Sequence, residues 1–169
     1  NPLPFREDAN TDRPLSPYAA SKKAAETLCY TYHTLCDLDV TVFRYFTVYG
    51  PRQRPDMAFH RFFSAILAGR PVVQYGDGLQ TRSFCFVDDL IEGFIRLMAT
   101  GDQVTGPINL GNPGEFTIRE LAEKVIALTG SSSRIEMRPL PTDDPQQRQP
   151  DITRAGNELG WTPKVDLDS

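Results

Sequence analysis

The chain has 169 residues, of which 40% are hydrophobic and 24% charged, and its formal net charge is -4. This composition excludes a disordered chain, and the acidic balance argues against a general nucleic-acid binder. No apolar run approaches the ~20 residues that a membrane-spanning helix needs. Three cysteines and two histidines, without metal-ligand spacing, fit neither a disulfide framework nor a metal site, and the sparse thiols favour a cytoplasmic protein.

Helical and strand-like segments alternate along the chain, which is typical of an α/β protein. The Ser-Pro pair at 16–17 predicts a helix start, because serine is a favoured N-cap and proline a favoured first helical residue. This helix carries Cys29 and Cys36 seven residues apart on one face, where they are expected to pack rather than react. The elements expected in the first half are a loop over 1–15, helices over 17–35 and 57–68, and strands over 40–46, 72–75 and 81–87, with breaks at 49–52 and 76–78.

The second half continues the alternation. Asp88 and Asp89 precede apolar residues at helical spacing (Leu90, Ile91, Phe94, Ile95 and Met98). We therefore interpret the two aspartates as N-capping residues rather than as a catalytic pair of carboxylates. Thr117 and Glu120 predict a capping box for a helix that ends at Gly130. The other elements expected are a strand over 108–110, a loop over 139–151 and a short helix over 152–159.

Tyr18 and Lys22 stand four residues apart, so a helix places the phenol and the ammonium group on one face. Tyr18 would also lie in the first helical turn, where the helix dipole favours negative charge. Lowering the pKa of a tyrosine from ~10 to about neutral takes roughly 4 kcal/mol of differential stabilisation. A tyrosine tuned in this way can take a proton from a sugar hydroxyl during hydride transfer. Taken alone, however, such a pair is more often an ordinary feature of an exposed helix surface.

Several short sequences follow this pair in a fixed order. They are SPYAASK at 16–22, FRYFTVYGPR at 43–52, YGDG at 75–78, TR at 81–82, VDD at 87–89 and NLG at 109–111. Together they resemble the extended short-chain dehydrogenases that act on nucleotide sugars, and the resemblance covers nearly the whole chain. It implies an α/β fold, namely the C-terminal part of a Rossmann-type doubly wound parallel sheet with a small α/β substrate domain. It also implies NAD as cofactor, a UDP-sugar as substrate and a homodimer.

The resemblance further implies a domain organisation, because this family has an N-terminal NAD-binding domain and a smaller nucleotide-sugar-binding domain. We expect residues 1–55 to be the end of the NAD-binding domain and 56–169 to be mostly the second domain, with 88–111 returning to the first. The chain thus looks like roughly the second half of a family member. The family's Gly-x-x-Gly-x-x-Gly loop for pyrophosphate is absent from this sequence. The family's catalytic serine or threonine would fall before Asn1, so the catalytic set within the chain is incomplete.

Two groups within the family share the resemblance. Residues 3–62 resemble UDP-glucuronate 4-epimerases and related UDP-sugar 4-epimerases most, whereas residues 80–163 resemble UDP-glucuronate decarboxylases most. The sequences that carry this division are FTVYGP at 46–51 and RPDM at 54–57 for the first group, and QTRSFCF at 80–86, NLGNPGE at 109–115 and DDPQQRQPDI at 143–152 for the second. Both groups act on a UDP-uronic acid and begin with oxidation at C4 of the sugar.

The resemblance assigns catalytic roles to three residues. Tyr18 matches the acid/base, and Lys22 matches the lysine that binds the nicotinamide ribose and lowers the pKa of the tyrosine. Arg148 matches an arginine that faces the sugar carboxylate in decarboxylating relatives, and its alternative is a solvated loop residue. Phe46 stands where the family lays backbone beside the nicotinamide, so Tyr18, Lys22 and Phe46 are the residues expected to contact NAD.

Five more residues, with Arg148, are expected to contact the UDP-sugar. Arg82 matches the arginine that holds the diphosphate, a role that suits the planar guanidinium fork. Thr47 stands where many relatives have an asparagine that contacts the substrate. At this position the threonine offers a hydroxyl as donor and acceptor in place of the amide. Asn109 matches a polar contact to the nucleotide sugar, or is a strand-end turn residue. Val73 and Tyr75 belong to a strand that packs near uracil in relatives, although both could be core residues.

Two hypotheses from different classes follow. The first is an NAD-dependent enzyme that modifies a UDP-sugar through a 4-keto intermediate, most simply by decarboxylating UDP-glucuronate to UDP-xylose. Its variant is a 4-epimerase of UDP-glucuronate or UDP-glucose. The second is a non-catalytic nucleotide-sugar-binding fragment, which the missing glycine loop favours for the isolated chain. The sequence upstream of Asn1 would separate these two hypotheses. It would also distinguish the two reactions, because decarboxylases of the family typically carry a glutamate after the catalytic serine or threonine, whereas epimerases usually do not.

Overall fold

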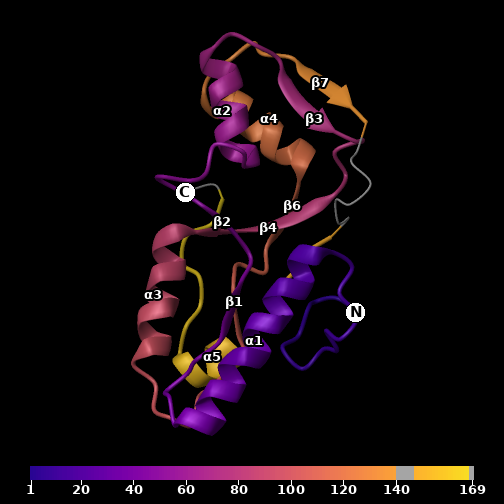
Figure 1. Ribbon diagram of the computed structural model, residues 1–169. Helices are drawn as coiled ribbons and strands as arrows, with labels where there is room; N and C mark the ends of the chain where they lie inside the picture. Colours follow the sequence, from indigo (N-terminus) through magenta and orange to yellow (C-terminus); the bar gives the residue numbers. More distant parts are fainter. Residues whose placement is uncertain (140–146, 168–169) are drawn as a thin grey trace.

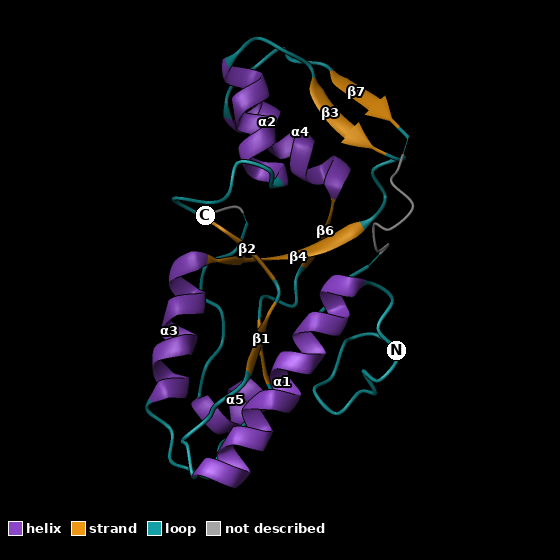
Figure 2. Cartoon of the chain, in the orientation of Figure 1, coloured by secondary structure: helices purple, strands orange, loops and turns teal. Residues whose placement is uncertain are grey.

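The computed structural model describes residues 1–139 and 147–167. Helices and strands alternate along the chain, which confirms the predicted α/β class (Figure 2). The helices are α1 (Pro17–Cys36), α2 (Ala58–Leu67), α3 (Val87–Met98), α4 (Ile118–Leu128) and α5 (Thr153–Leu159). The strands are β1 (Phe43–Tyr45), β2 (Thr47–Tyr49), β3 (Val72–Tyr75), β4 (Thr81–Phe86), β5 (Ile108–Leu110), β6 (Glu115–Thr117) and β7 (Ile135–Arg138).

The strands form small sheets that are mainly parallel. β1 pairs in parallel with β5, and β3 pairs in parallel with β7. β4 is the central strand of the third sheet, with β2 parallel on one side and β6 antiparallel on the other. Figure 1 shows two lobes, one with α1, α3, α5 and β1 and the other with α2, α4, β3 and β7, while β2 and β4 run between them. The central sheet therefore connects the two lobes.

Each lobe has its own hydrophobic core. In the first lobe, buried residues of β4, α3, β5 and α5 pack around Trp161; they are Cys85, Leu97, Ile108, Leu110 and Ala155. In the second lobe, the buried residues come from α2, β3, β4 and α4; they are Phe62, Val72, Phe84, Leu121, Ala122 and Val125. β4 contributes Cys85 to one core and Phe84 to the other, because successive side chains of a strand point to opposite faces.

Helix α1 begins where the sequence predicts, since the side chain of Ser16 accepts a hydrogen bond from the backbone N–H of Ala19. None of its residues is fully buried, so polar contacts attach it to the first lobe. The guanidinium of Arg44 on β1 donates two hydrogen bonds of 2.7 Å to the carboxylate of Glu26. The hydrogen bonds to Glu26 raise the pKa of Arg44, so the pair stays charged. This ion pair fixes the helix that carries Tyr18 against β1.

Of the strand predicted over 40–46, the structure contains β1, and β2 is a further strand, outside those bounds, that the sequence analysis missed. β1 ends at Tyr45, the backbone N–H of Phe46 donates to the carbonyl of Leu110, and β2 then pairs with β4. The predicted break after β2 is confirmed at Gly50, whose φ is +137°. A Cβ at this glycine would lie 2.7 Å from Cγ1 of Val87, so the close approach to the start of α3 requires glycine.

The sequence analysis missed β6 and β7. Both are short, and neither shows a run of β-branched or aromatic residues long enough to predict a strand. Part of the loop predicted over 139–151, residues 140–146, lies outside the described residues. Residues 147–149 are irregular, and Pro150 forms an isolated bridge with Phe5.

The packed face of α3 differs from the apolar stripe that its sequence suggests. Ile91, Ile95 and Met98 are 49%, 60% and 71% exposed, whereas Gly93 and Leu97 are buried. A Cβ on Gly93 would lie 3.0 Å from Nε1 of Trp161, so the missing side chain lets the helix approach the core closely. The position of this glycine, rather than the largest apolar residues, therefore sets the packed face.

The prediction that Asp88 and Asp89 cap α3 is wrong. Phe86 occupies the N-cap position, and both aspartates lie inside the first turn. Asp89 is buried, and its Oδ2 accepts hydrogen bonds from the backbone N–H groups of Lys164 and Val165, at 3.0 and 2.9 Å. Asp89 thus holds a segment that is distant in the sequence, a contact that spacing alone does not reveal.

We expect Asp89→Ala to lower the free energy of unfolding of the chain by about 1–3 kcal/mol, because two backbone donors lose their acceptor. Asp88→Ala is the matched control, since Asp88 is exposed on the same helical turn. Its effect should stay below about 1 kcal/mol, the scale of a helix-dipole interaction. Urea unfolding monitored by circular dichroism measures both variants, and equal losses would contradict the role assigned to Asp89.

Candidate active site

Tyr18 and Lys22 lie in the first two turns of α1 on one face, as predicted. The phenol of Tyr18 is exposed, with 70% of the residue accessible. The ammonium nitrogen of Lys22 lies 5.4 Å from the centre of the Tyr18 ring. The helix start therefore presents a solvent-facing tyrosine beside a lysine.

Tyr18 lines a cleft of about 610 Å³ that we call the tyrosine cleft. Its other lining residues come from the chain that leaves β1, passes through β2 and enters the following loop, together with the first residue of α3 and one residue near the C-terminus. They are Arg44, Tyr45, Phe46, Thr47, Val48, Tyr49, Gly50, Pro51, Arg52, Gln53, Arg54, Met57, Val87 and Arg148. Tyr18, Phe46, Thr47 and Arg148, all predicted site residues, meet here.

A second cleft of about 330 Å³, which we call the arginine cleft, adjoins the first. It is lined by residues of α2, β3 and β4 and by the start of α4; they are Thr47, Gln53, Asp56, Met57, Ala58, Phe59, Arg61, Phe62, Val73, Tyr75, Gln80, Arg82, Phe84, Ile118 and Arg148. Thr47, Gln53, Met57 and Arg148 line both clefts. The two clefts therefore adjoin each other, with Tyr18 lining one and Tyr75 the other.

The arginine cleft is suited to an anion. Arg82, Arg148 and Arg61 line it, and among the described residues Asp56 is its one lining carboxylate. The carboxylate of Asp56 is itself paired with Arg54, at 2.5 Å. Guanidinium groups bind phosphate and carboxylate oxygens through parallel N–H donors. The cleft thus contains three guanidinium groups where the resemblance expects a diphosphate.

Tyr75 forms a flat wall of the arginine cleft. Its ring lies 5.2 Å from the guanidinium carbon of Arg61, and a guanidinium nitrogen of Arg61 donates to its hydroxyl at 3.1 Å. This hydrogen bond lowers the pKa of Tyr75. Val73 lies on the same strand and lines the same cleft. An aromatic ring held in this way offers a stacking surface for a planar base.

Asn109 is the predicted substrate contact that the structure does not bring to either cleft. Its side chain is 2% exposed, and its Nδ2 donates to the carbonyls of Phe5 and Asp151, at 2.8 and 3.1 Å. Its backbone N–H donates to a carboxylate oxygen of Glu7. Through these hydrogen bonds Asn109 connects β5 to the segments around Phe5 and Asp151, which agrees with a structural role.

Sequence reasoning missed three residues that line the site. Gln53 and Met57 line both clefts, and Arg61 holds Tyr75. Gln53 is fixed by a hydrogen bond from its Nε2 to the carbonyl of Val48. Gln53 follows the predicted break at 49–52, and Met57 and Arg61 lie in the helix predicted over 57–68, but no pattern in the sequence points from these residues to a ligand.

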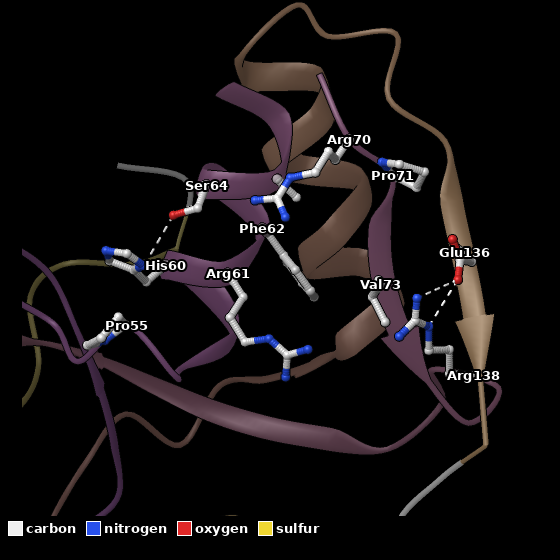
Figure 3. A pocket seen from close by; sticks show the side chains of 11 residues that line it. Pro55, His60, Arg61, Phe62, Ser64, Arg70, Pro71, Val73, Glu136 and Arg138 are labelled. Atoms are coloured by element: carbon white, nitrogen blue, oxygen red, sulfur yellow. Dashed lines mark hydrogen bonds and ion pairs between the residues drawn. The ribbon is translucent and has the colours of Figure 1, made fainter. Parts of the chain in front are cut away.

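A third hollow, of about 490 Å³, lies between α2 and β3 (Figure 3). Arg70 and Arg138 line it with His60, and Arg138 pairs with Glu136 at 2.9 Å. Of the predicted site residues, only Val73 reaches it.

Among residues 1–139 and 147–167, no group of three His, Cys, Asp or Glu residues is placed to hold a metal ion. No helix of the same described part has the length and apolar character to cross a membrane.

The cysteines differ in their environment. Cys36 is exposed at the end of α1, so the expectation that it packs is wrong, whereas Cys85 is buried in β4. Burial raises the pKa of Cys85 to about 12.

We expect iodoacetamide at about pH 8 to label Cys36 and spare Cys85, because only the thiolate reacts. Peptide mass spectrometry measures this, with a denatured sample as control for labelling of all sites. Equal labelling of Cys85 and Cys36 in the folded chain would contradict the burial.

The family model described as "NAD dependent epimerase/dehydratase family" matches residues 1–111. The chain belongs to this family. UDP-glucuronic acid decarboxylase 4 of Arabidopsis thaliana is 49% identical over 152 residues, which cover 89% of this chain and 34% of that protein. UDP-glucuronate 4-epimerase of Thermodesulfobacterium geofontis is 42% identical over 169 residues, which cover 98% of this chain and 51% of that protein.

The fold of the family is also found among solved structures. The crystal structure of UDP-glucuronic acid 4-epimerase from Bacillus cereus, in complex with UDP-glucuronic acid and NAD, has a TM-score of 0.86 to this chain at 38% identity. The match covers 92% of this chain and 50% of that one. The resemblance to epimerases and dehydratases of this family is therefore confirmed, as is the Rossmann-type α/β class. The chain spans about a third to a half of the length of these relatives.

Proposed function

We propose that this chain forms the substrate-binding part and the acid/base of a larger NAD-dependent enzyme that modifies a UDP-sugar. Three observations support this proposal: the family, the match to about a third to a half of the length of its members, and the adjoining clefts that Tyr18 and Tyr75 line. In the proposed division, residues 1–55 and 88–111 belong to the NAD-binding domain and the rest mostly to the sugar-nucleotide domain. The two separate hydrophobic cores support such a division, although Ala155 and Trp161 pack with α3 and β5.

The residues of the tyrosine cleft fit one end of the cofactor. An exposed phenol beside a lysine and the irregular backbone at Phe46 line a space open to a ligand. Tyr18, Lys22 and the backbone at Phe46 would hold the nicotinamide end of NAD, which supplies a hydride acceptor and donor when bound. The glycine loop for pyrophosphate is not in this sequence, so that contact belongs to another part of the whole protein.

In the proposed mechanism Tyr18 moves the proton that accompanies oxidation at C4 of the sugar. In its phenolate form Tyr18 takes the proton of the C4 hydroxyl and becomes a neutral phenol, and it later returns this proton to the same sugar oxygen. Thr47, at the junction of the two clefts, offers a hydroxyl to the sugar, and Arg82 binds the diphosphate. Val73 and Tyr75 would contact the uracil.

The position of Arg148 bears on which sugar the site accepts. Arg148 lines both clefts, so it stands between the acid/base at Tyr18 and the proposed diphosphate contact at Arg82. The sugar of a UDP-sugar occupies this middle position. A guanidinium there suits the C6 carboxylate of a uronic acid. This position of Arg148 supports UDP-glucuronate as substrate. For the reaction we propose decarboxylation to UDP-xylose, which the decarboxylase relatives support, with 4-epimerisation as the alternative that the epimerase relatives support.

The test compares Arg148→Gln with the wild type in the whole protein. We expect the variant to lose about ten- to a hundredfold in affinity for UDP-glucuronate, on the scale of a charged hydrogen bond, while affinity for UDP-glucose changes little. Carbon dioxide release from UDP-glucuronate should fall as well. Calorimetry and a radiometric assay measure the two effects. Undiminished release would rule out the carboxylate role of Arg148.

We also propose that the whole protein is a homodimer. The outward face of α1 exposes Leu28, Tyr32 and Leu35, and no residue of this helix is fully buried. Exposed apolar residues at helical spacing are typical of a helix that packs against a further partner. Such a surface supports the helical dimer interface that the resemblance implies.

A further inference from the structure

Ser83 ties the main chain of Arg148 to the central sheet. Ser83 lies on β4 and is 1% exposed, and its Oγ donates a hydrogen bond of 3.0 Å to the carbonyl oxygen of Arg148. Ser83 is among the lining residues of neither the tyrosine cleft nor the arginine cleft. The hydroxyl therefore acts on the position of Arg148 and does not face a ligand itself.

The residue before Arg148 is fixed to the same place on the sheet. Glu115 on β6 is the register partner of Ser83. Its two carboxylate oxygens accept hydrogen bonds from Nε2 of Gln147, at 2.7 and 3.0 Å. The hydroxyl of Thr81 donates to Glu115 as well, at 2.7 Å, and so holds the carboxylate toward Gln147. Two paired residues of neighbouring strands thus bind two consecutive residues of the C-terminal segment.

The residues after Arg148 are held by the N-terminal segment. The backbone N–H of Phe5 donates to the carbonyl of Gln149 at 2.8 Å, and the N–H of Asp151 donates to the carbonyl of Phe5 at 2.9 Å. Nε2 of Gln149 donates to the carbonyl of Pro113. Arg148 is exposed, yet its main chain is fixed on both sides. The other hydrogen bonds described here hold residues 147, 149 and 151, whereas the bond from Ser83 holds the carbonyl of Arg148 itself.

We propose that Ser83 is a positioning residue that sets where Arg148 meets the carboxylate of the sugar. This inference rests on the proposed function of Arg148. A long side chain can place its guanidinium reproducibly only if its Cα is fixed, and a displacement of about 1 Å at a reacting group can cost ~10²-fold in rate. The prolines of the segment restrict φ locally but do not attach the chain to the sheet. The buried hydroxyl supplies that attachment.

The experiment is Ser83→Ala in the whole protein, with UDP-glucuronate as substrate. We expect the rate of carbon dioxide release to fall about ten- to a hundredfold, as for a displaced catalytic contact. Affinity for UDP should stay unchanged, because UDP has no carboxylate for Arg148 to meet. Cys85→Ala is the matched control: it also removes one γ atom from a buried residue of β4, two positions further along. Equal effects of the two variants on release would overturn the proposal.

A double-mutant cycle distinguishes positioning from a general structural effect. If Ser83 acts through Arg148, Ser83→Ala should have no further effect on release in an Arg148→Gln background. Additive losses would overturn the proposal. If Arg148→Gln alone leaves release unchanged, the proposed function of Arg148 fails and the positioning role fails with it. If Arg148→Gln lowers release and Ser83→Ala does not, only the positioning role is contradicted.

A second variant keeps the proposal testable if Ser83→Ala does not fold. Ser83→Cys keeps the size of the side chain but replaces the hydroxyl by a weaker donor. We expect it to lower carbon dioxide release with unchanged affinity for UDP, and Ser83→Thr, which keeps the hydroxyl, to restore the rate. Wild-type release from Ser83→Cys, or no recovery in a folded Ser83→Thr, would contradict the role of the hydroxyl.

Discussion

Tyr18→Phe is expected to reduce turnover of the UDP-sugar by about 10²–10⁴-fold, the usual scale for losing a general acid/base. The substitution removes only the hydroxyl of an exposed ring, so the fold should not change. Affinity for the UDP-sugar should remain nearly intact, because the arginine cleft provides the charged contacts. Steady-state kinetics and calorimetry on the whole protein measure the two quantities separately.

The control for this variant is Tyr32→Phe, which removes a hydroxyl from another exposed tyrosine of α1 that lines neither cleft and keeps the apolar ring of the proposed dimer surface. Turnover of Tyr32→Phe should equal that of the wild type. Near-normal turnover of Tyr18→Phe would remove Tyr18 from the mechanism. A large loss of UDP-sugar affinity in Tyr18→Phe would instead make the phenol a binding group.

Arg82→Ala should weaken the binding of UDP and of UDP-sugars alike. A charge-assisted hydrogen bond contributes roughly 1.5–3 kcal/mol, so the expected loss is about ten- to a hundredfold. The effect should not depend on the sugar, because the proposed partner is the diphosphate. Calorimetry with UDP alone is the direct measurement.

The control for Arg82 is Arg134→Ala, at an exposed arginine before β7 that lines neither cleft. It should bind UDP as tightly as the wild type, which excludes a general effect of net charge. Unchanged UDP affinity in Arg82→Ala would refute the diphosphate assignment. A loss confined to UDP-glucuronate would move Arg82 from the diphosphate to the carboxylate.

The fold could be predicted where the signal is local. Helix α1 follows from Ser16 and Pro17, and α4 follows from the capping box of Thr117 and Glu120, which the structure contains. Strand β2 was not predicted, because residues 43–49 form one run of strand-forming residues and only the pairing partners divide it into β1 and β2. Likewise, β6 and β7 exist because β4 and β3 offer them an edge, which is information that their own residues do not carry.

In the candidate site, too, local geometry could be predicted from the sequence, but contacts between distant segments could not. The spacing of Tyr18 and Lys22 was sufficient to predict their geometry, since one helix fixes both residues. Asn109 and Asp89 could not be understood from spacing, because their partners are Phe5, Asp151, Lys164 and Val165, far away in the sequence. Arg148 was identified by resemblance, but its attachment to Ser83 depends on a contact between residues 65 positions apart.

Analysis of the products from UDP-glucuronate tests the central claim most directly. The whole protein is incubated with UDP-glucuronate and NAD, and carbon dioxide and the sugar nucleotides are measured together. We predict carbon dioxide and UDP-xylose in equal amounts, with both lost in Tyr18→Phe. The 4-epimer without carbon dioxide would contradict decarboxylation and assign the protein to the 4-epimerases, and the absence of any conversion, with bound UDP-glucuronate recovered intact, would contradict the catalytic account altogether.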